Sequence, residues 1–86
     1  EKKATVDFLK NYPALNLRQR ALLASAIEKP DESYTIDVHA AVHGVVYQTA
    51  RTDLLGLKDL GLLELRKSGK KMLFYPVEGL REKLKG

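Results

Sequence analysis

The stretch between residues 44 and 61 has the clearest pattern of apolar and polar positions in the chain. It begins at Gly44 and ends at Gly61, and Ala50, Leu54 and Leu57 recur between them at positions i, i+4 and i+7. This spacing predicts a helix with one buried face. The polar set on the other face consists of Gln48, Arg51, Thr52 and Asp59. We expect the rest of the chain to be organised around this helix.

A shorter helix is expected immediately before it. Asp37 can cap a helix from Val38 to His43, which Gly44 would end. A small residue at Ala40, the glycine, and a valine at position 45 to fill the angle between the helices have the spacing of a helix-turn-helix. We therefore predict a helix-turn-helix over about residues 37–60.

Upstream, the pattern predicts two helices and a short strand. A first helix over residues 4–11 would end before Pro13, because the residue preceding a proline avoids helical geometry. Asn16 and Gln19 have the positions of a variant capping box at the start of a second helix, Leu17 to Glu28. Its apolar face would be Leu22, Leu23, Ala26 and Ile27. Residues 34–36 are short and β-prone.

Downstream, alternation replaces helical spacing. Leu63 and Leu65 alternate with charged residues, which predicts a half-buried strand. Ser68 and Gly69 form a turn signal, and residues 72–77 form the return strand, giving a hairpin over about residues 62–77. Residues 78–85 predict a last short helix with Leu80 and Leu84 pointing inward. This order predicts an α+β fold, a winged helix-turn-helix with extra short helices at both ends.

Length and composition favour one globular domain over residues 1–86. The chain has 86 residues, of which 44% are hydrophobic and 30% are charged. No apolar run reaches the roughly 18 residues that a membrane helix requires, and no signal peptide pattern is present. We expect a cytoplasmic location. Because the chain does not begin with Met, we also expect it to be part of a longer protein.

The excess positive charge lies in the predicted hairpin. Net charge is +4, and Arg66, Lys67, Lys70 and Lys71 lie within six positions without an acid among them. Removing these four from the 15 basic residues leaves 11, against 11 acidic residues. Such a patch has the size of a phosphate-contact site. The alternative is a solvated hairpin tip, where lysines keep exposed strand edges from pairing.

The candidate chemistry argues against an enzyme. The chain has no cysteine, and its glycines are isolated, so no phosphate-binding loop is present. His39 and His43 have the spacing of two zinc ligands on one helix, but Ala40 replaces the glutamate of the zinc protease motif and no third ligand is evident. We expect both histidines on the outer face of their helix, with no metal and no cofactor.

Double-stranded DNA is the first predicted partner. The second helix of a helix-turn-helix lies in the major groove, where glutamine can bond adenine and arginine can bond guanine. The predicted hairpin at 62–77, which is the wing of this fold, would then contact phosphates. The predicted DNA-binding residues are Tyr47, Gln48, Arg51, Thr52, Lys67, Lys70 and Lys71.

A protein-interaction or dimerisation module is the alternative. Within the helix, Arg51 and Lys58 are balanced by Asp53 and Asp59, so electrostatic attraction to DNA would come from the wing alone. Position 46 is valine, which lacks the hydroxyl of a good helix cap. An exposed Leu55 would suit contact with another protein.

Four runs of the chain resemble the C-terminal winged helix of Fic family proteins. They are residues 15–20, 43–54, 57–63 and 69–76, and the sequence Thr-Ala-Arg-Thr-Asp-Leu at 49–54 followed by Gly-Leu-Leu at 61–63 is the most distinctive part. Val46 stands where relatives often have serine.

The resemblance implies a regulatory module appended to a bacterial enzyme that transfers AMP from ATP to a protein hydroxyl. The catalytic signature of that family, His-Pro-Phe-x-x-Gly-Asn-Gly-Arg, begins at neither His39 nor His43. The implied partners are therefore the parent catalytic domain, a target protein or a second copy of this chain.

Overall fold

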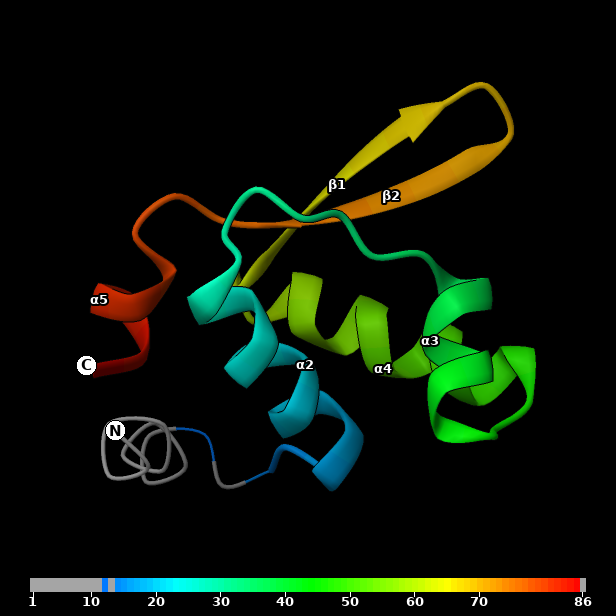
Figure 1. Cartoon of the computed structure of the whole chain (residues 1–86), viewed down its shortest axis with the longest axis horizontal. Helices are drawn as coiled ribbons and strands as arrows, with labels where there is room; N and C mark the ends of the chain where they lie inside the picture. Colours follow the sequence, from blue (N-terminus) through cyan, green and yellow to red (C-terminus); the bar gives the residue numbers. More distant parts are fainter. Residues whose placement is uncertain (1–11, 13, 86) are drawn as a thin grey trace.

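Three helices form the body of the part that the structure describes. They are α2 (Leu17–Glu28), α3 (Ile36–His43) and α4 (Tyr47–Asp59). An antiparallel hairpin of β1 (Leu63–Ser68) and β2 (Lys71–Pro76) follows, and then α5 (Leu80–Lys85). This computed structural model describes residues 12 and 14–85, so the helix expected over residues 4–11 lies outside them. The hairpin projects beyond the helices as a wing (Figure 1).

Helix α2 begins with the capping box that the sequence predicts. The side-chain oxygen of Asn16 accepts a hydrogen bond from the Gln19 amide at 2.8 Å, and Oε1 of Gln19 accepts one from the Asn16 amide at 3.0 Å. The two bonds satisfy backbone donors that a helix start otherwise leaves free. Leu22, Leu23 and Ala26 are buried, and Ile27 is half-buried against the core.

Helix α3 starts earlier than expected and has a different cap. Oγ1 of Thr35 accepts a hydrogen bond from the Val38 amide at 3.2 Å, so the prediction that Asp37 is the cap was wrong. Ile36 is buried, and burying it moves the start of the helix to that residue. Asp37 lies in the first turn, where a carboxylate favours the positive end of the helix dipole.

The β-prone segment at 34–36 contributes a single bridge. The Tyr34 amide donates to the Phe74 carbonyl at 2.7 Å, and the Phe74 amide donates back at 2.8 Å. Phe74 is fully buried, so the bridge attaches strand β2 to the segment that enters α3. The short strand that the sequence predicted is therefore one bridged residue beside the wing.

The turn between α3 and α4 follows the predicted helix-turn-helix pattern. Gly44 has a φ of 62°, a left-handed conformation that other residues rarely adopt, and the Val45 amide donates to the Ala40 carbonyl at 3.0 Å. Val45 is half-buried against the core. The predicted apolar face of α4, namely Ala50, Leu54 and Leu57, is fully buried.

The wing is a regular hairpin with its loop at Gly69 and Lys70. Strand pairing runs from Leu63 opposite Pro76 to Ser68 opposite Lys71. Only the first loop residue, Gly69, has a positive φ, which is the pattern of a type II′ turn. Helix α5 begins at residue 80, two residues later than expected. Leu80 and Leu84 are buried as predicted.

Candidate nucleic-acid interface

The predicted polar face of α4 is open to solvent. Tyr47, Gln48, Arg51 and Thr52 are all exposed, and Tyr47 retains 52% of its accessible surface. The Thr52 hydroxyl donates to the Gln48 carbonyl at 3.0 Å, which fixes the hydroxyl against the helix and leaves its oxygen free to accept. The helix therefore offers side chains of the kind that read base edges or contact phosphate.

The exposed lysines of the wing lie at and beside its loop. Lys67, Lys70 and Lys71 are exposed, and Ser68 and Gly69 separate the first from the other two. Arg66, the fourth basic residue of the hairpin, is already engaged: its Nε donates to Oε1 of Glu64 at 2.7 Å, and its guanidinium lies 5.1 Å from the centre of the Tyr75 ring. The free positive charge of the wing thus belongs to the three lysines.

A groove joins the wing to the start of α4. Its volume is about 400 Å³, and it brings Tyr47 of α4 together with Lys70 and Lys71 of the wing. The remaining lining residues are Thr35, Ile36, Asp37, Val38 and Met72. Two parts of the predicted site that lie more than twenty residues apart in sequence are therefore adjacent in space. Gln48, Arg51, Thr52 and Lys67 do not line the groove.

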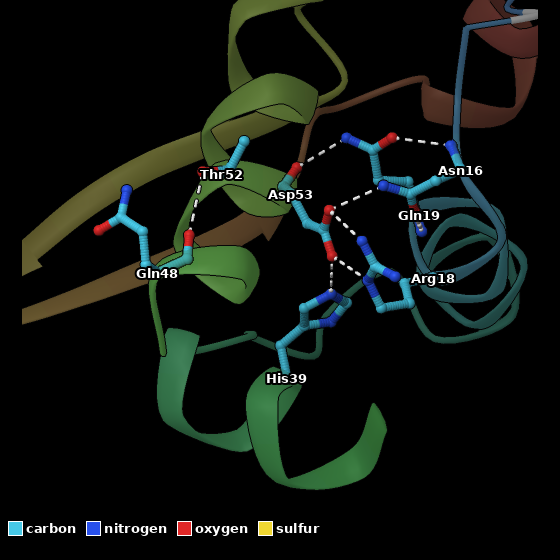
Figure 2. A network of polar contacts seen from close by, with 7 residues as sticks. All are labelled: Asn16, Arg18, Gln19, His39, Gln48, Thr52 and Asp53. Atoms are coloured by element: carbon cyan, nitrogen blue, oxygen red, sulfur yellow. Dashed lines mark hydrogen bonds and ion pairs between the residues drawn. The ribbon is translucent and has the colours of Figure 1, made fainter. Parts of the chain in front are cut away.

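Sequence reasoning missed a buried polar network on the opposite side of α4. The carboxylate of Asp53 is 2% exposed and accepts hydrogen bonds from α3 and from the start of α2 (Figure 2). Arg18 contributes Nε at 2.6 Å and Nη2 at 3.3 Å, Asn16 contributes Nδ2 at 2.8 Å, and His39 contributes Nε2 at 3.0 Å. Gln19 adds a bond from Nε2 to the Asp53 backbone carbonyl at 3.0 Å.

These partners keep Asp53 ionised despite its position. Burial alone would raise the pKa of the carboxyl, but hydrogen bonds from Arg18, Asn16 and His39 outweigh it and hold the pKa below its ordinary value. Arg18 supplies the compensating positive charge through a salt bridge. Asp53 therefore does not cancel Arg51 on the exposed face, and the prediction of a neutral α4 surface was wrong. The exposed charged residues of α4 are Arg51, Lys58 and Asp59, which leaves one positive charge in excess on its surface.

The histidine pair also differs from expectation. His39 is 5% exposed and bonded to Asp53, so it does not lie on the outer face of α3. The ring centres of His39 and His43 lie 4.7 Å apart. Burial, followed by the nearby charges of His39 and Arg18, lowers the pKa of His43. Within the described residues, no group of three or more His, Cys, Asp or Glu side chains could hold a metal ion.

Three exposed valines lie on α3 and the turn, and Leu17 and Leu60 are also exposed, whereas Leu55 is not. Leu55 is partly buried and packs against the core, which corrects the expectation of an exposed leucine. Val38, Val42 and Val46 are 57%, 71% and 69% exposed. Val38 and Val42 are four residues apart and so share one face of α3. We call these three residues the valine patch. None of the described helices is both long and apolar enough to cross a membrane.

Comparison with solved structures shows the fold. A MarR family transcriptional regulator from Rhodococcus sp. RHA1 has 22% identity and a TM-score of 0.66, with 96% of this chain and 62% of that chain covered. A homodimeric winged helix-turn-helix DNA-binding domain from Mycobacterium bovis has 22% identity and a TM-score of 0.63, with 93% of this chain and 70% of that one covered. The chain has the winged helix-turn-helix fold.

BpsR of Bordetella bronchiseptica, whose DNA binding is regulated by 6-hydroxynicotinic acid, is a third similar structure. It has 16% identity and a TM-score of 0.64, with 96% of this chain and 61% of that chain covered. This chain thus spans less than two thirds of the MarR family regulator and of BpsR. No family model and no curated protein matches the sequence. The three similar structures are a transcriptional regulator and two DNA-binding proteins.

Proposed function

We propose that this chain is a DNA-binding module that places α4 in the major groove and rests its wing on phosphates. The observation that carries the proposal is the groove in which Tyr47 meets Lys70 and Lys71. It places Tyr47, at the start of α4, beside two lysines of the wing, which supports contact of one duplex with both elements. The DNA-binding function of the similar regulators supports the same proposal.

Each part of this surface has a distinct role in the proposal. Gln48 and Arg51 read base edges, since their side chains can form bidentate hydrogen bonds with adenine and guanine. Thr52 and Tyr47 contact the sugar–phosphate backbone beside them. Lys67, Lys70 and Lys71 neutralise phosphates and supply the part of the affinity that depends on salt.

Fluorescence anisotropy with a short mixed-sequence duplex tests the proposal. If three lysines engage phosphates, log affinity should fall against log salt with a slope of about −2.7. Reversing the charge of Lys70 and Lys71 together, each to Glu, should abolish binding at moderate salt. Absence of binding by the wild-type chain at low salt would rule the proposal out.

A matched control separates local contact from overall charge. Lys70→Glu and Arg81→Glu each change net charge by two units, and both side chains are exposed. Arg81 lies on α5, far from α3 and the loop of the wing (Figure 1). Lys70→Glu should weaken DNA binding strongly and reduce the slope of log affinity against log salt by the contribution of about one phosphate. Arg81→Glu should change the affinity and the slope little. Equal losses would indicate general charge attraction.

Protein interaction is the second candidate function, and the valine patch favours it. Exposed apolar side chains gathered on one helix and its turn are a common feature of interaction surfaces. A second copy of the chain or the parent catalytic domain would cover the patch. Light scattering should then show a dimer that Val42→Asp dissociates and that tolerates salt. A wild-type monomer that also fails to bind the parent domain would exclude it.

We also infer that the module belongs to a cytoplasmic, AMP-transferring Fic enzyme in a bacterium. Two of the runs that carry this resemblance, 15–20 and 43–54, meet in the structure: Arg18 and Gln19 of the first bond Asp53 of the second. The full coding sequence around this chain should contain the His-Pro-Phe-x-x-Gly-Asn-Gly-Arg signature. A complete reading frame without that signature would refute the assignment.

A further inference from the structure

The buried carboxylate of Asp53 connects α4 to both other helices of the body. Among the described residues it is the only buried Asp or Glu. It accepts from Arg18 and Asn16 at the start of α2 and from His39 on α3. Figure 2 shows these donors on the side of α4 that faces away from Gln48. One side chain thus relates α4 to two different helices at once.

The capping box of α2 is part of the same connection. Asn16 uses its side-chain oxygen to cap α2 and its Nδ2 to bond Asp53. Gln19 completes the capping box with Oε1 and donates from Nε2 to the Asp53 carbonyl. The residues that start α2 therefore also bond the side chain and the backbone of α4 at one position.

A glycine allows the close approach that these bonds require. A Cβ atom on Gly56 would lie 3.0 Å from Nε2 of Gln19, too near for an undisturbed contact. Glycine inside a helix costs about 1 kcal/mol relative to alanine, so Gly56 needs a structural reason. The space for Gln19 supplies it.

Directional bonds fix what apolar packing leaves free. Ala50, Leu54 and Leu57 hold α4 against the core, but apolar contacts are non-directional and tolerate small rotations and shifts. Hydrogen bonds to a carboxylate have narrow geometry. Successive helical residues are about 100° apart, so fixing Asp53 also fixes the directions of Arg51 and Thr52.

The network is costly as a source of stability alone. A buried ion pair often contributes little more than well-packed apolar residues of similar volume, because both charges lose hydration. Removing one partner is damaging because the other charge stays buried without compensation. A network that adds little net stability but is damaging to break is suited to favour one orientation of α4 over similar orientations.

We propose that Asp53, held by Asn16, Arg18 and His39, is a positioning residue that sets the orientation of α4 and thereby aligns Gln48, Arg51 and Thr52 for DNA. The alignment for DNA rests on the function proposed above. The orientation of α4 does not, because it is a property of the free protein. The two parts can therefore be tested separately.

Residual dipolar couplings of the amide groups measure the orientation directly. Asp53→Asn keeps the shape of the side chain and removes its charge, and Arg18→Gln breaks the same salt bridge from a residue that is one-third exposed. In either folded variant the amide vectors of α4 should reorient relative to those of α2. Arg18→Lys, which retains the positive charge, should restore most of the wild-type orientation.

Leu80→Ala provides the matched control. Leu80 is buried in the same core but lies on α5 and has no part in the network. Under conditions where every variant stays folded, it should lower the free energy of unfolding without reorienting α4. Wild-type couplings in folded Asp53→Asn and Arg18→Gln, or an equal reorientation in Leu80→Ala, would overturn the proposal.

DNA affinity is the second readout. Asp53→Asn and Arg18→Gln should weaken duplex binding by at least about fivefold, which corresponds to the loss of one good base contact. The salt slope should stay at the wild-type value, because the wing lysines are untouched. Reoriented couplings with unchanged affinity would refute the alignment role. If the wild-type chain bound no DNA, the DNA function would fail and the couplings alone would decide the orientation of α4.

Discussion

Helix α4 and the wing form the two halves of the proposed interface, and they differ in how firmly the rest of the protein fixes them. Helix α4 is fixed by a fully buried apolar face and by the hydrogen bonds to Asp53. The wing is a two-stranded hairpin in which Phe74 is fully buried, while the residues around its loop are exposed. The difference separates two functions: α4 requires accurate placement to read bases, whereas lysines on the wing need only reach phosphates.

The largest expected contrast comes from truncating one residue in each half. Leu54→Ala should lower the free energy of unfolding by about 2–5 kcal/mol, because it leaves a cavity under α4. Lys67→Ala on the wing should change it by no more than about 0.5 kcal/mol, because the side chain is exposed. Urea unfolding followed by circular dichroism measures both values. Comparable losses would show that the wing is as much part of the folding unit as α4.

A pair of substitutions tests the contact between α2 and α4. Gly56→Ala should lower stability in the wild-type chain, because the new Cβ displaces Gln19 from a buried bond worth about 1–3 kcal/mol when lost. In a Gln19→Ala background that conflict is absent, so the same change should raise stability by up to about 1 kcal/mol. The reversal of sign in a double-mutant cycle is the diagnostic result.

The contact between α2 and α4 could not be predicted from the sequence, although the fold could. The alternation of Leu63 and Leu65, the spacing of Ala50, Leu54 and Leu57, and the glycine at position 44 are local patterns, and they were sufficient for the fold. The sequence shows that Asp53 is negatively charged but does not show its hydrogen-bond partners, so Asp53 was counted as a surface charge. Its position between Ala50 and Leu54, on the apolar face, was the available signal.

The same reasoning explains the error at His39. A histidine on a short helix is read as exposed unless a partner is known, and its partner lies 14 residues away in sequence. The prediction of the α3 cap was wrong for a different reason. Both Thr35 and Asp37 can cap a helix, and the burial of Ile36, a tertiary effect, decided between them. The exposed residues of the predicted DNA site lie where the sequence placed them, and their role stays a prediction.

Acid should destabilise the folded protein through His43. The pKa of His43 is lowered in the folded state, so unfolding takes up a proton and stability should decrease as the pH falls through about 6.5, the ordinary histidine value. His43→Gln should remove this decrease. Urea titrations at a series of pH values measure it, and an unchanged pH dependence in His43→Gln would contradict the assignment.

Asp53 should produce a second, lower transition. Its pKa is depressed in the folded state, so its contribution is complete above its ordinary value of 3.8 and is lost as the pH falls toward the folded value. Asp53→Asn should be less stable than the wild-type chain at neutral pH, and the difference should shrink in acid. A constant difference down to pH values below 3.8 would mean that the charge of Asp53 is not what stabilises the body.

The smallest expected change lies at the junction of the two halves. Val46 occupies the cap position of α4 and is 69% exposed, so a serine there should fit without loss of core packing. Its hydroxyl can accept from a free amide at the helix start, which is worth about 1 kcal/mol. Val46→Ser should therefore raise Tm by a few degrees, while Val46→Ala, which cannot accept a hydrogen bond, should not. In the DNA assay the serine should bind at least as tightly, because a hydroxyl at a helix start suits phosphate. If Val46→Ser instead weakened a protein complex and left DNA binding unchanged, the valine patch would be the functional surface and α4 would serve as its support.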